Sequence, residues 1–299
     1  MRHIVCGLTP VLVLVSISAM ARAEPIVGIG NGDIAQHGIL YSVDPISGAV
    51  APLGPSGTSA GFYPVSPSPV VGSYFALSPV NHYLLTYPKA GTLDSPEFSL
   101  WDNSLVGLGD YAYDSSNGKL FALRLGLQNA PPAAGLVLLT DTGTSFPNRP
   151  NSHSLTATLL ASAPVFPALS LIEYIQGFGL YGTDGHAAYL IDETTGAATQ
   201  LPSLAYTGPI ITGLAYDPAS GRLIGTSGSL FPSTNMRSYI YGINPLTGQV
   251  TVLNSDAPNM FGLSAVSIPE PSAMFLLAVG ILCVWPRRFA PRGFVSLRT

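Results

Sequence analysis

The sequence predicts an all-β protein: a β-propeller of about five four-stranded blades, or six if a further blade is present. N- and C-terminal strands close the ring, and one C-terminal hydrophobic helix follows it. Three observations support this fold. The middle of the chain is rich in Gly, Ser, Thr, Pro and Tyr, which favour strands and turns over helices. A hairpin turn recurs five times, and the two ends of the body hold complementary incomplete repeats.

The recurring turn starts with Asp or Asn and ends with Gly. The first side chain accepts backbone N–H groups of the turn, and Gly supplies the positive φ needed where the next strand starts. Strand-forming residues flank every copy, so each copy predicts a hairpin. The copies are Asp44–Gly48, Asp114–Gly118, Asp192–Gly196, Asp217–Gly221 and Asn244–Gly248.

The turns fall into two registers, one between the first and second strands of a unit and one between the third and fourth. Residues 207–255 contain both and form a whole unit of the length of a propeller blade. Further units are predicted at 108–161, with a longer internal loop, at 165–202, and in degenerate form at 70–106. A sixth blade would have to lie in 55–72 or 143–165.

The two ends of the body complement each other. Residues 26–29, 39–43 and 49–53 supply three strands of a unit without a first strand, and residues 260–266 resemble a first strand without followers. Propellers close their ring in this way, which leaves no open sheet edge. A pair of β-sandwiches is the alternative fold, but sandwiches do not require matching ends.

The body is acidic and has no cysteine. Residues 24–269 contain 15 Asp and Glu against 6 Lys and Arg, a net charge of about −9. Nucleic acid is therefore not an expected partner, because phosphate contacts need clustered basic residues. The two cysteines, Cys6 and Cys283, lie in the terminal segments, which argues against disulfides and thiolate chemistry in the body.

Residues 1–23 have the pattern of a secretory signal peptide. A basic start precedes an apolar run, and Ala21-Arg22-Ala23 forms an A-x-A cleavage site with Ala21 and Ala23 as its small residues. A retained membrane helix is the alternative, and Pro10 argues against it. We expect an exported protein.

The C-terminus combines a Pro269-Glu270-Pro271 motif, a short apolar run over 273–285 and the basic pair Arg287 and Arg288. Together these elements resemble the PEP-CTERM sorting signal of Gram-negative envelope proteins. The resemblance implies that an exosortase-type membrane protease processes the chain. It also implies inner-membrane anchoring through the helix before processing, and a place at the cell surface or outside the cell afterwards. A plain C-terminal membrane anchor is the alternative.

Four segments are therefore expected: signal peptide 1–23, propeller-like domain 24–267, sorting and anchor segment 268–288, and basic tail 289–299. The tail places 11 residues after Arg288, where such signals usually end within a few.

Two motifs suggest catalysis but lack their context. Gly57–Gly61 matches G-x-S-x-G, yet the prolines that follow forbid the helix that a nucleophile elbow needs. Residues 138–144 resemble the D-T-G loop of aspartic proteases, which needs a second carboxylate. The segment also aligns with residues 190–196, so we interpret it as another turn after a third strand.

No metal site or cofactor site is expected, and no catalytic residue is assigned. His37, His82, His153 and His186 are isolated, and the oxygen-rich turns at 30–33 and 184–186 lack the alternating ligands of a calcium loop. Residues 28–32 have the wrong spacing for a dinucleotide fingerprint.

Two functions remain open. The first is a non-catalytic surface or matrix protein that acts as an interaction platform, with polysaccharide or other surface proteins as partners. The second is a secreted propeller hydrolase or lyase acting on polysaccharide, for which Asp110, Glu173 and Asp184 are scattered acids without an evident pairing. Tyrosines in or beside the strands suit either blade packing or a carbohydrate-binding face; they are Tyr41, Tyr111, Tyr113, Tyr181, Tyr216, Tyr239 and Tyr241.

Overall fold

The computed structural model describes part of the chain between residues 26 and 266. The described residues are 26–30, 39–55, 63–67, 73–78, 83–88, 98–101, 108–124, 135–146, 149–162, 166–228 and 237–266. All of them belong to the compact unit Ala23–Glu270. The regular elements among them are β-strands, which confirms the predicted all-β class.

The strands form four sheets in the described part of the chain. The first has the order β20 (Met260–Ala265), β1 (Ile26–Gly30), β2 (Ile39–Val43), β3 (Val50–Pro55). The third contains β12 (Leu171–Ile175), β13 (Gly179–Thr183), β14 (Ala188–Ile191) and β15 (Ala198–Gln200). The fourth contains β16 (Gly213–Asp217), β17 (Arg222–Thr226), β18 (Arg237–Ile243) and β19 (Val250–Pro258).

The second sheet has eight strands and joins two four-stranded runs. One run is β4 (Tyr63–Pro67), β5 (Ser73–Ser78), β6 (Tyr83–Pro88) and β7 (Phe98–Trp101). The other is β8 (Leu108–Asp114), β9 (Lys119–Arg124), β10 (Gly135–Phe146) and β11 (Arg149–Ser162). Parallel pairing of β7 with β11, over Ser99–Trp101 and Ser152–Ser154, connects the two runs.

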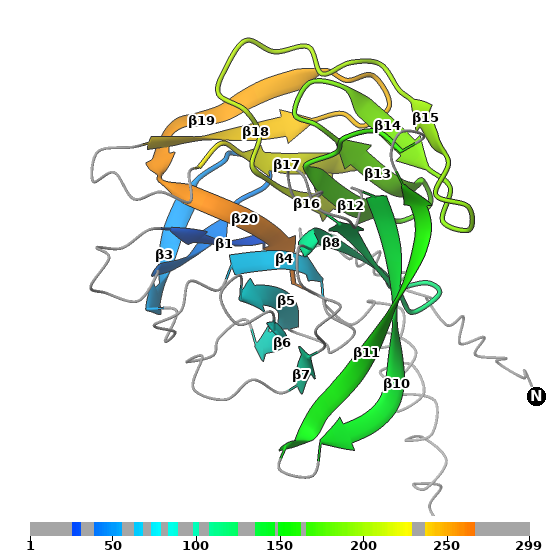
Figure 1. The fold of residues 1–299 in the computed structure, drawn as a ribbon. Coiled ribbons are helices and arrows are strands. Elements are labelled where there is room, and N and C mark those ends of the chain that lie inside the picture. Colours follow the sequence, from blue (N-terminus) through cyan, green and yellow to red (C-terminus); the bar gives the residue numbers. More distant parts are fainter. Residues whose placement is uncertain are drawn as a thin grey trace, which may run out of the picture. The chain divides into compact units, whose positions relative to one another are not determined.

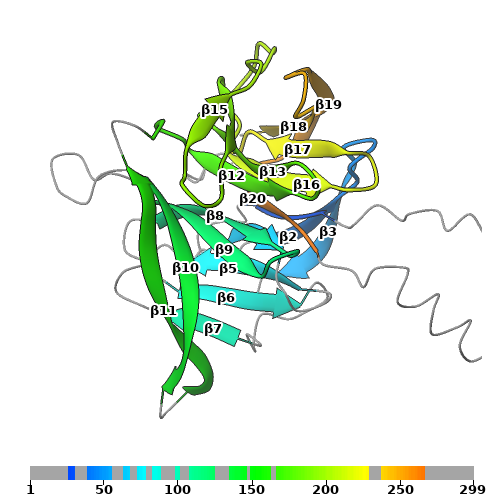
Figure 2. The same cartoon turned by 90° about the vertical axis from the view of Figure 1, so that its right-hand side faces the viewer.

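The sheets have a propeller arrangement, in which the first strands of successive runs are neighbours. β8 lies beside β12, β12 beside β16, β16 beside β20, and β4 beside both β20 and β8. Figures 1 and 2 show these strands meeting in the middle while the later strands lie farther out. The predicted propeller architecture is therefore confirmed.

The predicted number of blades is wrong: the structure has four blades rather than five or six. The hairpin of β10 and β11 has strands of 12 and 14 residues, and Figure 1 shows it projecting beyond its neighbours. At this length β11 reaches the open edge of β7, and pairing of the two edges satisfies backbone groups that would otherwise be exposed. The two runs therefore form a single blade of eight strands. Within 143–165 the described residues belong to β10 and β11 instead of a further blade, and β4 supplies a strand within 55–72.

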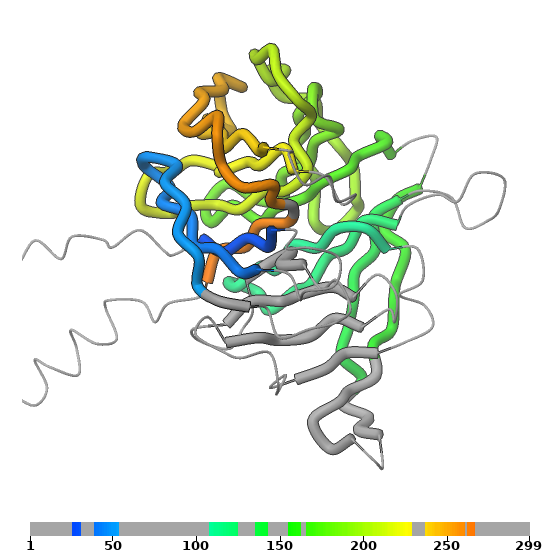
Figure 3. Tube along the Cα trace, turned by 90° about the vertical axis from the view of Figure 1, so that its left-hand side faces the viewer, coloured from blue at the N-terminus to red at the C-terminus, as the bar shows by residue number. Residues whose placement is uncertain are grey.

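The predicted closure of the ring is confirmed. β20 pairs antiparallel with β1, with Ile26 opposite Ala265 and Gly30 opposite Met260. Figure 3 shows the N-terminal strand, in blue, beside the orange C-terminal strand. The first sheet thus combines strands from the two ends of the body and leaves no gap between its first and last units.

The five predicted turns form with nearly the same geometry. Their last glycines have φ between 66° and 71°, and each glycine N–H donates to the carbonyl oxygen of the Asp or Asn four positions earlier at 2.8–3.0 Å. In the turn Asp44–Gly48, Asp44 Oδ1 also accepts the N–H groups of Ile46 and Ser47, at 2.8 and 2.9 Å. The residue types that predicted the turns therefore make the expected bonds.

The core lies between the sheets. Phe121 and Leu136 of the eight-stranded sheet pack on Leu180 of β13. Tyr181 of β13 packs in turn on Tyr241 of β18. Tyr111, Tyr181 and Tyr241 are each 0–1% exposed, which supports blade packing as their role.

We expect loss of a turn carboxylate to destabilise the fold. Asp217 is buried and accepts the N–H groups of Ala219 and Ser220 at 3.2 and 3.1 Å. Asp217→Ala should lower the free energy of unfolding, measured in urea, by about 1–2 kcal/mol, because these donors lose their partner. Asp217→Asn keeps an acceptor oxygen and is the control. Equal losses in both variants would contradict this role.

The predicted C-terminal helix and the signal peptide lie outside the described residues. Within the described residues, no helix is long and apolar enough to cross a membrane.

Candidate functional site

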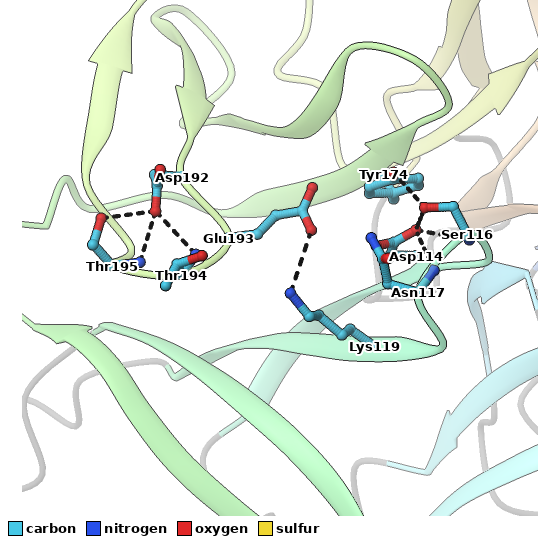
Figure 4. Close-up of polar contacts among 9 residues, drawn as sticks. All are labelled: Asp114, Ser116, Asn117, Lys119, Tyr174, Asp192, Glu193, Thr194 and Thr195. Carbon is cyan, nitrogen blue, oxygen red and sulfur yellow. Dashed lines mark hydrogen bonds and ion pairs between the residues drawn. The ribbon is translucent and has the colours of Figure 1, made fainter.

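A group of hydrogen-bonded polar side chains lies where two sheets meet at their turns (Figure 4). Asp114, at the end of β8, is fully buried and accepts four hydrogen bonds. Ser116 donates its N–H and O–H to Oδ1 at 2.8 and 2.6 Å, and Asn117 donates its N–H to Oδ1 at 3.3 Å and Nδ2 to Oδ2 at 2.7 Å. Tyr174 of β12 lies across the junction, its hydroxyl 3.2 Å from Ser116 Oγ.

Glu193, in the turn between β14 and β15, approaches this group from the neighbouring sheet. Its Oε2 lies 4.0 Å from Lys119 Nζ. Burial raises the pKa of Glu193, and the negative charge of Asp114 raises it further. Burial also acts to raise the pKa of Asp114, but hydrogen bonds from Ser116 and Asn117 outweigh it, so that this pKa is lowered. Of these two carboxyls, Glu193 is therefore the one that takes up a proton first as the pH falls.

This cluster connects sheets, and its composition does not suit a metal. The oxygens of Asp114 are already occupied by donors from its own turn. Among the described residues, no three His, Cys, Asp or Glu side chains gather in a geometry that could hold a metal ion.

Two further acids lie on first strands. Asp110 of β8 is 9% exposed, and its Oδ2 accepts the N–H of Ile172 in β12 at 2.8 Å. Glu173 of β12 is 1% exposed, and its Oε1 accepts the N–H of Tyr216 in β16 at 3.1 Å. Each carboxyl thus bonds the backbone of the next first strand around the ring. Burial raises the pKa of Asp110 to about 7, although N–H groups of Ile172 and Tyr111 lower it.

The third scattered acid belongs to a turn. Asp184 Oδ1 accepts the N–H groups of His186 and Ala187 at 2.8 and 2.7 Å. These bonds form the tight turn expected for residues 184–186. Asp184 thus stabilises its own turn, whereas Asp110 and Glu173 bond a neighbouring strand. The three acids that the sequence left unpaired are therefore tied to backbone N–H groups at separate positions.

An aromatic row lies at the other end of these sheets from the turn cluster. The ring of His186 stacks on Tyr206 with centroids 6.1 Å apart, Tyr206 lies 5.4 Å from Tyr241, and Tyr241 stacks on Tyr239 at 5.9 Å. The Tyr206 and Tyr241 hydroxyls donate to the carbonyl oxygens of Gly185 and Pro209 at 2.9 and 3.3 Å. His186 is exposed, and Tyr206 and Tyr239 are half-buried. The row therefore extends from the buried Tyr241 to an exposed edge at His186.

One sequence interpretation is corrected here. Residues 138–144 do not form a turn after a third strand, because β10 continues through them to Phe146. Pairing with β11 extends past Asp141, and the register shifts between Asp141 and Ser145. Long-range pairing with β11 thus overrides the local resemblance to residues 190–196. Gly57–Gly61 and residues 31–33 lie outside the described residues.

The C-terminal segment supplies the functional identification. Residues 267–288 match the PEP-CTERM protein-sorting motif. The chain carries a PEP-CTERM sorting signal. The matched range includes Pro269, Glu270 and Pro271 and the basic pair Arg287 and Arg288. Such a motif implies an exported protein that an exosortase, a membrane protein, processes for sorting to the surface. The signal-cleavage residues Ala21 and Ala23 lie outside the described residues and stay a prediction.

Comparison with curated proteins finds no sequence relative of the chain. Among solved structures, one chain of the nidogen/laminin complex is similar to this protein, with 12% identity and a TM-score of 0.49. The similarity covers 82% of this chain and 100% of that chain. TolB from Acinetobacter baumannii covers 82% of this chain and 67% of its own, with 11% identity and a TM-score of 0.42. The periplasmic gluconolactonase of Pseudomonas aeruginosa covers 83% of this chain and 100% of its own, with 14% identity and a TM-score of 0.41. No activity follows from similarities at this level.

Proposed function

We propose that this protein is an exported, non-catalytic interaction platform whose propeller is delivered to the cell surface by exosortase processing. The match of residues 267–288 to the PEP-CTERM motif carries the proposal. The signal-peptide pattern at residues 1–23 agrees with it, since both signals are needed for export followed by sorting.

The geometry of the acids supports a non-catalytic body. A propeller hydrolase acting on polysaccharide would need two carboxyls facing a common space where a sugar can bind. Instead, Asp110 and Glu173 are buried and accept N–H groups from successive strands. Asp184 is engaged in its own turn. Each acid therefore has a structural task that accounts for its position.

The proposal is tested by mass spectrometry of the protein in a Gram-negative host that has an exosortase. We expect the surface or released form to begin after Ala23 and to end within residues 269–272. Replacing Pro269, Glu270 and Pro271 together by alanine should leave the full C-terminus attached in the membrane fraction. The matched control replaces Ser267 by alanine, outside the Pro-Glu-Pro motif. A surface form that retains Arg287 and Arg288 in the natural sequence would refute processing.

A further inference from the structure

The closing strand leaves the propeller at a defined end of its sheet. Ala265 lies opposite Ile26, Ile26 opposite Val43, and Val43 opposite Val50. The turn Asp44–Gly48 follows Val43, so it closes the same end of the sheet at which β20 finishes. The sorting signal therefore starts from the end of the sheet that carries this turn.

The neighbouring sheet presents its turns at the same end. A Cβ added to Gly213, at the start of β16, would lie 3.0 Å from the Cα of Gly262 near the start of β20. The two strands thus start side by side, and β16 lies beside β20. Asn254 Nδ2 also donates to the carbonyl oxygen of Gly48 at 3.0 Å, which joins the two sheets. We call the end that carries the turns Asp44–Gly48, Asp217–Gly221 and Asn244–Gly248 the turn face.

Two apolar side chains project from the turn face. Ile46 is 72% exposed and Leu246 is 64% exposed, the highest values among the large hydrophobic residues of the described part of the chain. Both occupy the third position of a turn. The turn itself does not need an apolar residue there, because the other three copies have Ser116, Thr194 and Ala219 at this position. The turn geometry therefore does not require apolar side chains at Ile46 and Leu246, and their exposure leaves both available to a partner.

The chain outside the described residues indicates which partner this is. Six residues, 267–272, separate Val266 from the apolar run that starts at Ala273. Fully extended they span about 20 Å, and Pro269 and Pro271 favour extended backbone over helix. With the apolar run in a membrane, this short connection keeps the turn end of β20 close to the lipid headgroups.

We propose that, before processing, the turn face lies on the outer surface of the inner membrane, with Ile46 and Leu246 inserted between lipid headgroups. This inference rests on the proposed sorting function. The lipid is zwitterionic rather than anionic in this proposal, because the body is acidic and anionic lipid would repel it. The Asp44 and Asp217 carboxylates keep their hydrogen bonds in this arrangement, because both accept N–H groups of their own turns. Cleavage within residues 269–272 then separates the body from its anchor and lets the turn face leave the membrane.

Site-specific labelling tests the proposal. The body has no cysteine, so single cysteines at Ile46, Leu246 or Ile210 can be labelled in the full chain once Cys6 and Cys283 are replaced by serine. Ile210 is the matched control: it is apolar and 56% exposed. Its side chain lies near Gly185, in the turn between β13 and β14 at the opposite end of that sheet. The chain is reconstituted in phosphatidylcholine vesicles that contain a lipid-borne quencher.

We expect quenching at positions 46 and 246 to be at least threefold stronger than at position 210. Equal quenching at the three positions, or quenching at 210 alone, would overturn the proposal. The same preparation is treated with the exosortase and examined by mass spectrometry. Normal cleavage without quenching at positions 46 and 246 would refute the lipid contact of the turn face. It would leave the proposed sorting function in place. Failure of the chain to insert or to be cleaved counts against the sorting function, and with it this inference.

Discussion

The free energy of unfolding is expected to fall as the pH rises from about 4 to about 7, because of Asp110. Its pKa is 3.8 when unperturbed and about 7 in the folded chain, chiefly because burial disfavours the charged form. Between these values the folded state holds a proton that the unfolded state has released, so stability decreases with rising pH. A difference of about three pKa units corresponds to about 4 kcal/mol, fully lost above pH 7.

Urea unfolding of the natural protein and of Asp110→Asn, at pH 4.5 and pH 8, measures this effect. The asparagine keeps an acceptor oxygen for the N–H of Ile172 and cannot ionise. We therefore expect the variant to lose most of the pH dependence and to exceed the natural protein in stability at pH 8. Asp44→Asn is the control, since hydrogen bonds from Ser47 and Ile46 lower the pKa of the exposed Asp44. If the free energy of unfolding of Asp110→Asn depended on pH as strongly as that of the natural protein, Asp110 would not be the group that carries the buried proton.

Gly228→Ala is expected to weaken the closure of the ring. Gly228 is buried beside Met260, and an added Cβ would overlap the carbonyl oxygen of Met260. This backbone is fixed at the start of β20, because Thr226 Oγ1 donates to Met260 O at 3.1 Å and Met260 N donates to Ser238 Oγ at 2.8 Å. The Met260 backbone cannot yield without breaking these bonds. We expect a loss of about 3 kcal/mol or more in the free energy of unfolding.

Hydrogen exchange shows whether this loss is located at the closure. In Gly228→Ala the amides of β1, Ile26–Gly30, should exchange faster than those of β13, because β20 no longer pairs with β1 in register. Gly242→Ala is the matched control in the same sheet. Its added Cβ would meet Leu253 Cδ1 at 3.4 Å, an ordinary contact, and should cost less than about 1 kcal/mol. Uniform acceleration across the sheets in Gly228→Ala would contradict a local effect.

Much of the fold was predictable because its signals are local. An Asp or Asn followed by Gly at the fifth position makes its bonds within the turn, as Asp44 and Gly48 do. The strands beside such turns follow from their residues, and the repeats could be counted. The closing strand was also predictable, since Met260–Ala265 repeats the pattern of Gly213–Asp217 and has no followers.

The number of blades and the course of β10 were not predictable in this way. Pairing of β7 with β11 joins residues about 50 positions apart through three residue pairs. Nothing in the sequence of Ser99–Trp101 specifies a parallel partner. The same holds for Asp141, whose surroundings resemble a turn locally and become a strand through pairing with β11.

The sequence by itself determined the five turns, the complementary ends of the ring and the sorting signal. In each of these the residues that make the interaction lie close together in the chain or repeat an earlier pattern. Only the tertiary structure decided that Asp110 is buried against Ile172 and that Ile46 and Leu246 are exposed at the end where β20 finishes. Burial and exposure depend on how separate sheets pack, and that packing brings together residues with no common signal in the sequence.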